Sequence, residues 1–520
     1  MSSVLLTDAR LAGGDGSAVD ITVIDGVVTA IVPAGRAGSA MPATTPADRI
    51  ALDGRWVLPG LWDEHVHFTQ WASVSRRLDV SAAASAAETA ALVGDALRRA
   101  ASRPAGAPSE LGEPGAPELL IGYGFRDALW PDTPSAALLN AVSGAHPVVL
   151  VSGDLHCCWL NTAALERFGQ AGHPDGVLRE EPAFAVHRAL DDVPVATSDA
   201  WAREASQAAA ARGVVGIVDL EMAWNHEVWS RRLAAGHDLL RVEFGVYPQH
   251  LDRAIAEGLH TGDPLDAAAL VRVGPSKIIT DGSLNTRTAF CFDEYPGLEG
   301  RPESRGLLTV HPDDLLELLR RGSAGGLTPA VHAIGDHANA LTLDAFEALR
   351  AERPADAPAP RRRSTLEHAQ LLAESDFERF ARLGVVASVQ PEHAMDDRDV
   401  ADRFWAGRTG RSFALASLLA AGAELALGSD APVAPLDPWV TLAAAVGRTR
   451  DGREPWHPEQ RIPVGAALAA SARGRTGVAV GDPADLVAVD LDPFDAAPDA
   501  LRTMPVALTL LSGRVTHSAL

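Results

Sequence analysis

Lysine is almost absent from this chain of 520 residues. Lys277 is the only lysine, and the other 44 of the 45 basic side chains are arginine. It lies in the apolar stretch "GPSKIITDGSLN". Arginine cannot replace lysine where an amine must lose its proton or act as a nucleophile. A single retained lysine therefore indicates a chemical requirement at this position, with a residual surface lysine as the alternative.

Cysteines and long apolar runs are also scarce. The three cysteines, of which Cys157 and Cys158 are adjacent, cannot form a disulfide framework and are interpreted as buried small hydrophobic residues in a reducing compartment. No uninterrupted apolar run reaches about 18 residues, so we expect no membrane span. The amino terminus lacks a basic region and reaches Asp8 early, which argues against a signal peptide. Together these absences predict a cytoplasmic protein.

Positive charge is in short supply as well, because the formal net charge is −23. Such a charge repels phosphate backbones and anionic lipids, so neither nucleic acid nor a membrane surface is an expected partner. The apolar fraction of 47% and the charged fraction of 22% are typical of a folded globular protein. We expect the partner to be a small-molecule substrate, and a homodimer is one possible oligomeric state.

The two ends of the chain share one style of sequence. Residues 1–58 contain short alternating strands separated by turn signals, and "GDPADLVAVDLDP" and "VALTLLSGRVTHSAL" repeat this style near the carboxyl terminus. The pattern predicts a β-sandwich domain built from residues 1–58 and 475–520.

The middle of the chain alternates apolar strands with Ala/Leu-rich helical stretches, which is the pattern of βα units around a parallel sheet. Eight strands are predicted, in "WVLPGLWDEHVHF" and in segments 213–221, 240–247, 276–282, 327–335, 364–370, 384–390 and 424–431. Eight successive units predict an α/β fold, a (β/α)8 TIM barrel over residues 59–71 and 205–474, with its site at the carboxyl ends of the strands. Residues 72–204 are too many for an ordinary connection and predict an inserted α/β subdomain.

Candidate metal ligands fall at the ends of four predicted strands. His65 and His67 lie two apart in "DEHVHF", and residues i and i+2 of a strand point to the same face, so both imidazoles can reach one ion. His332 follows "LTPAV", His368 follows "STLE" and Asp430 follows "ELALGS". Each alone could be a helix cap or a hydrogen-bonded core residue. Four imidazoles and one carboxylate together predict a site for zinc or another divalent transition metal.

Lys277 offers the anion that a pair of metal ions would need. Two ions about 3.5–4 Å apart require an anionic bridge, and no carboxylate stands out for this role, although Asp219 and Glu221 are formal candidates. Burial in an apolar strand favours the neutral amine of Lys277. That amine can add carbon dioxide and become a carbamate, whose two oxygens can bridge two ions. The predicted cofactors are therefore one or two Zn²⁺ ions per chain, and carbon dioxide as a carbamate on Lys277.

These residues and their surroundings resemble the metal-dependent amidohydrolase superfamily, and specifically its YtcJ-like group, which includes N-substituted formamide deformylases (amidohydrolase family 3). The resemblance extends over nearly the whole chain and rests on "LPGLWDEHVHF", "GDLHCCWLNTAAL", "SKIITDGSLNTRTA", "VHAIGDHA", "LEHAQ", "VASVQPEH" and "LALGSDAPV". It implies a (β/α)8 barrel, a β-sandwich formed by both chain ends, and an insertion after the first barrel strand.

The resemblance also implies how the ligands are divided. His65 and His67, completed by Asp430, would bind the more buried ion. His332 and His368 would bind the second ion, and carboxylated Lys277 would bridge the two ions. Some relatives work with a single metal ion, so the occupancy stays open.

The implied activity is hydrolysis of a C–N bond in an amide, an N-formyl group or a cyclic amide by metal-activated hydroxide. Asp430 would orient the water, accept its proton and return the proton to the leaving amine. One alternative is a mononuclear deaminase of the same superfamily that acts on an aminated heterocycle. Such enzymes use a His-x-x-Glu pattern that "HAIGDH" lacks, and they would give Lys277 no role. The other alternative is a noncatalytic small-molecule-binding protein, whose usual sign is the loss of ligands.

Substrate contacts are predicted from the same resemblance. His156 and Trp159 in the inserted segment, and Gln390 after the seventh strand, match positions that face the pocket. Tyr123 in "GYGFRDALW" is predicted to form a wall or lid. A packing aromatic and a hydrogen-bonded loop amide are the alternative interpretations.

Overall fold

The computed structural model describes residues 3–36, 48–101, 119–191, 193–353 and 361–520 of the chain. The chain divides into two compact units. The first consists of Met1–Phe68 and Arg203–Leu520, and the second of Thr69–Ala202. Each unit has its own sheet or sheets and its own core, so each is described by itself.

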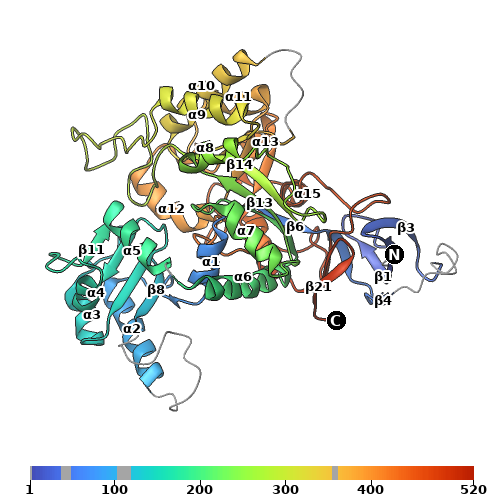
Figure 1. Cartoon of the computed structure of the whole chain (residues 1–520), viewed down its shortest axis with the longest axis horizontal. Coiled ribbons are helices and arrows are strands. Elements are labelled where there is room, and N and C mark those ends of the chain that lie inside the picture. The colour runs from blue at the N-terminus through green and yellow to red at the C-terminus, as the bar shows by residue number, and fades with distance from the viewer. Residues whose placement is uncertain (1–2, 37–47, 102–118, 192, 354–360) are drawn as a thin grey trace. The chain divides into compact units, whose positions relative to one another are not determined.

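An eight-stranded parallel sheet forms the centre of the first unit (Figure 1). Its hydrogen-bonded order is β18-β17-β16-β15-β14-β13-β12-β6. The strands are β6 (Leu61–Val66), β12 (Val214–Asp219), β13 (Arg241–Val246), β14 (Val271–Ile279), β15 (Pro329–Ala333), β16 (Thr365–His368), β17 (Val386–Val389) and β18 (Leu425–Leu427). The two ends of this order meet, because Val66 pairs with Ala431 and the N–H of His67 donates to the carbonyl of Ala431 at 2.8 Å. The predicted (β/α)8 barrel is confirmed.

Asp63 and Gly428 lie where the first and last barrel strands meet. The carboxylate of Asp63 on β6 accepts hydrogen bonds from the backbone N–H groups of Ser429, at 2.9 Å, and His65, at 3.2 Å. Gly428 passes so close to β6 that a Cβ atom there would lie 2.8 Å from the Cβ of His65, so only glycine fits without a shift. The closure brings Asp430 beside His65.

Helices cover the outside of the barrel (Figure 1). Every residue of β12 and β16 is buried, as expected for strands with the barrel interior on one face and helices on the other. Helix α9 begins with Pro312 and two aspartates and has Arg321 in its last turn, an order that suits the helix dipole. The remaining helices of this unit are α7 (Asn225–Ala234), α8 (Pro248–Ala256), α10 (Asp336–Glu352), α11 (Phe377–Leu383), α12 (His393–Phe404), α13 (Leu415–Ala420), α14 (Pro438–Gly447), α15 (Val464–Ser471) and α16 (Pro498–Arg502), with α9 at Pro312–Ala324 and short 3₁₀ turns at Glu374–Asp376, Thr409–Arg411 and Pro458–Gln460.

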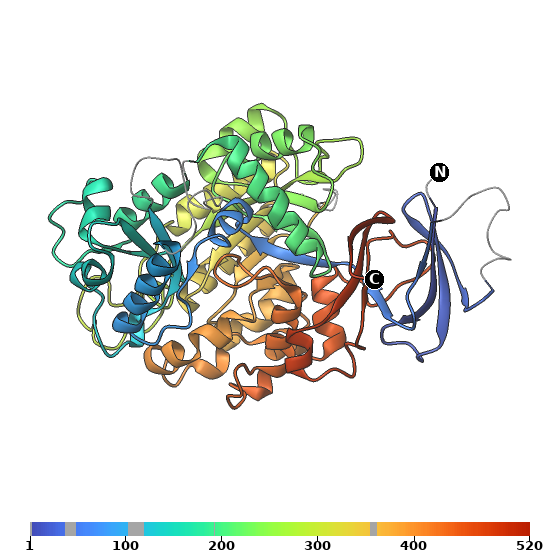
Figure 2. The same ribbon diagram turned by 90° about the horizontal axis from the view of Figure 1, so that it is seen from below.

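Strands from both chain ends share a second sheet, in which the blue and red strands of Figure 2 lie together. Its order is β21-β20-β19-β5-β1-β2-β3, with β4 paired to β1. The amino-terminal strands are β1 (Ser3–Leu11), β2 (Ala18–Ile24), β3 (Val27–Pro33), β4 (Asp48–Ala51) and β5 (Trp56–Pro59), and the carboxyl-terminal ones are β19 (Leu486–Val489), β20 (Val506–Leu511) and β21 (Arg514–Ser518). The antiparallel pair β5–β19 joins the two groups, so both chain ends belong to one hydrogen-bonded sheet.

Gly60 marks the passage from this sheet into the barrel, between β5 and β6. A Cβ atom at Gly60 would lie 2.4 Å from a methyl carbon of Val215, a distance at which the side chain or the strand would have to move. The "PG" of "WVLPGLW" is therefore explained by close packing against β12.

The second unit contains a five-stranded sheet with the order β11-β10-β9-β8-β7. Its strands are β7 (Leu78–Asp79), β8 (Leu120–Phe125), β9 (Val148–Ser152), β10 (Cys157–Leu160) and β11 (Val177–Arg179). Its helices are α2 (Ala86–Ala101), α3 (Ala136–Ser143), α4 (Thr162–Arg167) and α5 (Glu181–Asp191), with a 3₁₀ turn at Asp127–Leu129. Helices α1 (Phe68–Val74) and α6 (Val195–Ala210) contain the residues at which the two units are divided.

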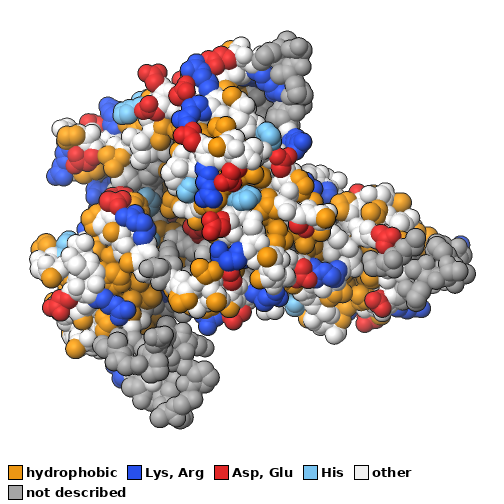
Figure 3. Space-filling model, viewed as in Figure 1, with side chains coloured by type: hydrophobic (Ala, Val, Ile, Leu, Met, Phe, Trp, Pro, Cys, Tyr) orange, Lys and Arg blue, Asp and Glu red, His pale blue; other side chains and the backbone are white. Residues whose placement is uncertain are grey.

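The surface shows how the excess of acidic residues is distributed. On the face drawn in Figure 3, acidic and basic side chains lie interspersed rather than in one large area of a single sign. Within the described residues, we find no helix whose length and apolar character would let it cross a membrane.

Candidate metal centre

The predicted ligands meet at the carboxyl end of the barrel. His65 lies near the end of β6, His332 near the end of β15 and His368 at the end of β16, while Asp430 follows β18. His65 is 1% exposed, His368 is 5% exposed and Asp430 is 7% exposed. Side chains from strands far apart in the sequence therefore share one buried region.

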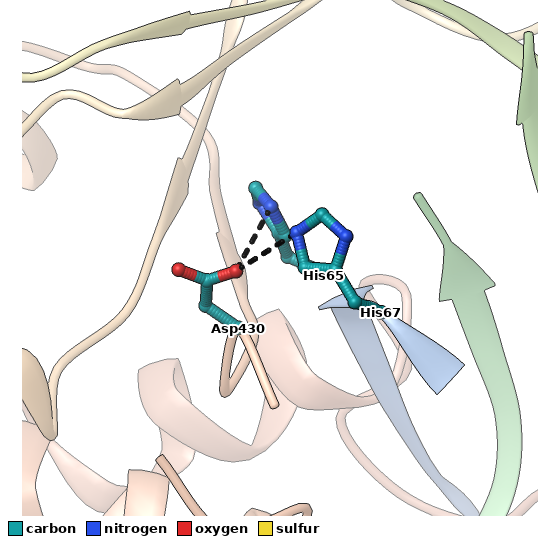
Figure 4. Close-up of side chains that lie close together, drawn as sticks. All are labelled: His65, His67 and Asp430. Atoms are coloured by element: carbon teal, nitrogen blue, oxygen red, sulfur yellow. Dashed lines mark ion pairs between the residues drawn. The ribbon is translucent and has the colours of Figure 1, made fainter. Parts of the chain in front are cut away.

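His65, His67 and Asp430 form the first group (Figure 4). The Nε2 atoms of His65 and His67 lie 3.4 Å and 3.3 Å from the same oxygen of Asp430, Oδ1. All three possible ligand atoms lie within 4.8 Å of one another. Both rings and the carboxylate thus point at one location, as three ligands of a single ion would.

His332 and His368 lie beside this group. Their ring centroids are 4.4 Å apart, and the ring of His368 is 5.1 Å from that of His65. A further imidazole, that of His393, joins His368 and Asp430 in a second group whose possible ligand atoms also lie within 4.8 Å of one another. Sequence reasoning assigned no role to His393, although "VASVQPEH" contains it.

Lys277 is buried in β14, with an exposed fraction of 1%, so the alternative of a residual surface lysine is wrong. Its Nζ atom has no hydrogen-bond partner among the described residues. Burial lowers the pKa of Lys277, and the negative charges of Glu367 and Asp430 oppose that shift. The amine therefore lies among the candidate ligands and is disposed to be neutral.

Two carboxylates outside the predicted set lie beside candidate ligand histidines, and one of them makes a hydrogen bond. The Nδ1 of His65 lies 2.7 Å from Glu367 Oε2, and burial alone would raise the pKa of Glu367, but the contact with His65 and the nearby Lys277 lower it to about 2. An ionised Glu367 accepts a hydrogen bond from the Nδ1–H of His65 and leaves Nε2 of His65 available to a metal. Asp281 Oδ1 lies 3.4 Å from Nε2 of His332, but this nitrogen has no hydrogen-bond partner among the described residues.

Sequence reasoning missed both carboxylates. Glu367 directly precedes His368 in "LEHAQ" and Asp281 stands in "ITDGS", so each was visible within a motif, but their partners come from other strands. Asp281 is held in place because it accepts hydrogen bonds from the backbone N–H groups of Ile334 and Gly335.

The two formal alternatives to a lysine bridge have other roles. Asp219 Oδ1 accepts a hydrogen bond from the N–H of Phe68 at 3.1 Å, and Oδ2 accepts one from the indole N–H of Trp229 at 2.7 Å. Glu221 Oε1 accepts a hydrogen bond from the N–H of Met222 at 3.0 Å. Asp219 in particular uses both oxygens to hold protein groups.

These residues fit a divalent metal ion. Several buried atoms of the cluster have no hydrogen-bond partner among the described residues, and these are His67 Nδ1, Lys277 Nζ, His332 Nε2, His368 Nδ1 and His393 Nε2. Native proteins rarely leave buried polar atoms unsatisfied, so such a concentration indicates a bound ligand. Burial lowers the pKa of His65 to about 4, with Lys277 adding to the shift, so its imidazole is neutral at pH 7, as a metal ligand must be.

Comparison with known proteins shows which family the chain belongs to. The sequence pattern of the amidohydrolase family matches residues 48–517. This chain belongs to the amidohydrolase family. It is therefore a hydrolase, and its cluster of histidines and a carboxylate stands where the barrel should hold a metal-dependent site.

Three relatives show the extent of the similarity of this amidohydrolase. It is 29% identical over 453 residues to the protein LONG AFTER FAR-RED 3 of Arabidopsis thaliana, covering 81% of this chain and 74% of that protein. It is 26% identical over 520 residues to amidohydrolase YtcJ of Bacillus subtilis strain 168, covering 90% of each. It is also 26% identical over 423 residues to the N-substituted formamide deformylase of Arthrobacter pascens, covering 73% of this chain and 75% of that enzyme.

A solved structure shares the fold. The crystal structure of an uncharacterized metal-dependent hydrolase from Pyrococcus horikoshii OT3 superimposes with a TM-score of 0.75 at 21% identity, covering 96% of this chain and 99% of that one. At this level of identity the likeness supports the fold of the amidohydrolase rather than its substrate.

Two of the metal-centre residues of the amidohydrolase have unusual backbone conformations. His368 has a φ of 71° and Asp430 a φ of 57°, both in the left-handed region that side chains with a Cβ rarely adopt. Such conformations cost on the order of 1–3 kcal/mol each, and they occur in turns as well as at active sites, where they cluster. Here they occur where β16 and β18 deliver a side chain to the cluster.

The predicted substrate contacts lie in different surroundings. Gln390 is 3% exposed and its Nε2 lies 3.3 Å from Nδ1 of His65, so it contacts one of the candidate metal ligands. In the second unit, Trp159 is fully buried in the core, which favours the packing interpretation. Tyr123 donates its hydroxyl proton to the carbonyl of Gly153 at 3.0 Å. His156 Nδ1 lies 3.0 Å from Glu180, and its contact with substrate stays a prediction.

Proposed function

We propose that this amidohydrolase uses a binuclear zinc centre to cleave a C–N bond in an uncharged or modestly polar amide, N-formyl compound or cyclic amide. The observation that supports this most is the buried amine of Lys277, which has no hydrogen-bond partner among the described residues and interacts electrostatically with His65 and Asp430 of the first group. We further propose a cytoplasmic enzyme that acts on a small molecule without a nucleic acid or membrane partner, and that can pair into a homodimer.

The ligands in this proposal are those of the carboxyl end of the barrel. His65, His67 and Asp430 would hold the first ion, and His332 and His368 the second. When bound, the ions supply Lewis acidity, which lowers the pKa of a water molecule and polarises the substrate carbonyl.

Lys277 has to change chemically to bridge two ions. The nitrogen lone pair of its neutral amine forms a bond to the carbon of carbon dioxide, one C=O π pair moves to oxygen, and the nitrogen releases one proton. The product is a carbamate with one negative charge and two oxygens. Burial, which lowers the pKa of Lys277, favours the neutral amine that this step requires.

Asp430 is the residue proposed to move the proton. It lies between the imidazoles of the centre, and although burial would raise its pKa, those imidazoles hold the pKa of Asp430 well below its usual range. An ionised Asp430 can orient a water molecule, accept its proton as the C–O bond forms, and return that proton to the amine nitrogen as the C–N bond breaks. Glu367, which accepts a hydrogen bond from Nδ1 of His65, holds that imidazole in place during this transfer.

Amide hydrolysis is favoured over deamination by the position of Lys277. A mononuclear deaminase would leave a buried amine in the centre without a task, and unsatisfied buried groups are costly. The similarity to an enzyme named N-substituted formamide deformylase also supports an N-formyl or related amide as the substrate class.

The test combines metal analysis with a substrate screen. Protein prepared with zinc and ¹³C-labelled bicarbonate should contain two zinc ions per chain and give a carbamate carbon signal that Lys277→Ala lacks. The same protein should release amine from members of a panel of N-formyl, N-acyl and cyclic amides. Release of ammonia from aminated heterocycles, with no amide hydrolysed, would instead favour the deaminase.

A further inference from the structure

His393 is the first residue of α12, which begins shortly after β17 ends at the carboxyl end of the barrel. Its side chain is buried, with 6% of the residue exposed, and its Nε2 atom has no hydrogen-bond partner among the described residues. That atom lies 3.9 Å from Oδ2 of Asp430. The separation is too long for a hydrogen bond, so the imidazole faces the carboxylate without bonding to it.

The two oxygens of Asp430 face different imidazoles. Oδ1 lies 3.4 Å and 3.3 Å from the Nε2 atoms of His65 and His67, whereas Oδ2 faces His393. The ring of His368 lies parallel to that of His393, with centroids 6.0 Å apart at an angle of 25°. The possible ligand atoms of His368, His393 and Asp430 lie within 4.8 Å of one another, as do those of the first group. Asp430 thus belongs to two groups of candidate ligands, one with His65 and His67 and the other with His368 and His393.

A buried ion-pair network fixes the start of α12. Glu392, the residue before His393, is 3% exposed and pairs with Arg502 through two contacts of 2.9 Å. It also accepts a hydrogen bond from Arg450 at 2.9 Å, and Arg450 bonds Asp396 one turn along the helix at 2.7 Å. Two-point contacts of this kind hold a backbone in one position. His393 is therefore placed by rigid neighbours, which a metal ligand requires.

We propose that His393 is a ligand of the second metal ion, on the Oδ2 side of Asp430, together with the predicted ligands His368, which belongs to the same group, and His332, whose ring lies 4.4 Å from that of His368. The inference rests on the proposed binuclear centre and adds a residue that the predicted ligand set lacks. A site with this many imidazoles favours zinc, cobalt or nickel over magnesium or calcium, which prefer oxygen ligands.

Cobalt(II) titration of the metal-free protein tests the proposal without any substrate. Wild type should bind two cobalt ions, and His393→Ala should weaken one of them by roughly 100-fold or more, since even partners outside the ligand set change metal affinity by 10–100-fold. His67→Ala should weaken the other ion. Equal cobalt affinity of wild type and His393→Ala at every site would overturn the proposal.

A cysteine variant supplies a spectroscopic signature. In His393→Cys, a thiolate bound to cobalt should produce a near-ultraviolet charge-transfer band that wild type lacks. His187→Cys is the matched control, because His187 is a buried histidine of the second unit whose Nε2 atom also lacks a partner among the described residues. The control should show no such band. Absence of the band in a folded His393→Cys protein, judged by its circular dichroism, would also overturn the assignment.

These readouts separate the inference from the proposed function. Failure of wild type to hydrolyse any amide would count against the proposed substrate class and leave the cobalt results unchanged. Normal cobalt binding by His393→Ala would remove the ligand assignment and leave the amide proposal unaffected.

Discussion

The two ends of the barrel both bury charged side chains, but they treat them differently. At the carboxyl end, Lys277 and several imidazole nitrogens have no hydrogen-bond partner among the described residues. At the amino end, the polar network consists of the ion-paired residues Glu64, Glu243, Arg362 and Arg473. The first residues of three strands line a cavity of about 440 Å³ beside this network, which places the network where those strands begin.

Contacts within the network at the amino end are close. Arg473 Nε donates to Glu64 at 2.7 Å, Arg362 donates to the same carboxylate at 2.9 Å, and both arginines also pair with Glu243. The guanidinium of Arg473 stacks over Trp62 at 3.3 Å from the ring centroid. Two positive and two negative side chains thus neutralise one another beside this cavity.

The difference between the two ends shows how buried groups that stabilise the fold can be told apart from buried groups that bind a ligand. A buried charge with its partners in place needs no ligand, and removing one partner leaves the other uncompensated. A buried cluster of ligand-type atoms without partners is explained by a ligand that binds there. Variants at the amino end should therefore affect stability alone, while variants at the carboxyl end should affect metal and activity.

The largest effect should come from Lys277→Ala. Without the bridging carbamate the protein should lose most of its bound metal, and turnover should fall by about 10³-fold or more, because the metal accounts for several kcal/mol of barrier lowering. Lys277→Arg should not restore either property, since a guanidinium cannot form a carbamate. Elemental analysis and turnover on the best amide of the panel would measure both. Full metal content and normal turnover in Lys277→Ala would refute the bridge.

Glu243→Gln should produce the largest effect on stability. It leaves Arg362 and Arg473 short of one charge in a half-buried network, so the cost should lie between the about 1 kcal/mol of an exposed pair and the about 3–5 kcal/mol of a buried one. The midpoint of denaturant unfolding should fall while the metal content stays at the wild-type value. Glu424→Gln is the matched control, because Glu424 pairs with Arg363 at a half-exposed site and should change stability by about 1 kcal/mol or less. Loss of metal in Glu243→Gln would contradict the prediction that variants at the amino end affect stability alone.

Acid should erase the difference between wild type and Glu243→Gln. Burial alone would raise the pKa of Glu243, but Arg473 and Arg362 lower it from its ordinary value of 4.5 to about 2. A lowered pKa contributes stability that is complete above pH 4.5 and is lost as the pH falls towards 2. Unfolding midpoints of both proteins, measured between pH 7 and pH 2 without metal, should converge at the acid end. A constant gap across this range would show that Glu243 is not the titrating group.

Glu367→Gln should have a moderate effect at the carboxyl end. The variant keeps the size of the side chain but loses the charge that fixes Nδ1 of His65 as the protonated nitrogen. Loss of such a partner typically lowers metal affinity by about 10–100-fold. Competition with a coloured zinc chelator would measure the change. An unaltered zinc affinity would mean that His65 is oriented by its packing instead.

The smallest effect should be a gain of stability in the metal-free protein. Lys277→Met replaces a buried amine without a partner by an apolar side chain of similar length, which should raise the free energy of unfolding by about 1 kcal/mol. Denaturant unfolding in the presence of a chelator would detect this. A loss of stability would show that the amine has a partner even without metal, and would weaken the contrast with the amino end.

Local patterns in the sequence were enough to predict much of the fold. All eight barrel strands were found because apolar runs such as "GVVGIVDLE" need no distant information, and β12 lies within that run. Lys277 could also be singled out from the sequence alone, because it is the only lysine and lies in an apolar run, which is β14 in the structure. The metal-ligand role of the predicted residues stays a prediction, although the structure brings His65, His67 and Asp430 together.

Other parts of the site depend on pairings between distant strands. His65 and Glu367 are 302 positions apart, and Arg473 and Glu64 are 409 apart, so no spacing rule could join them. For Trp159 the motif itself was misleading. It suggested a pocket residue, whereas the complete burial of Trp159 favours a packing role. Motifs report residue types, whereas burial depends on what the rest of the chain places around them.

The sequence by itself determined the order of βα units and the chemical types of residue at the strand ends, because strand periodicity and ligand chemistry are local properties. Only the tertiary structure decided that His393 faces the second oxygen of Asp430 and that Glu367 orients His65. It also decided that the charged side chains at the amino end pair with one another, while Lys277 Nζ and several imidazole nitrogens have no hydrogen-bond partner among the described residues. The physical reason is barrel closure, which sets the register between strands that the chain forms hundreds of residues apart.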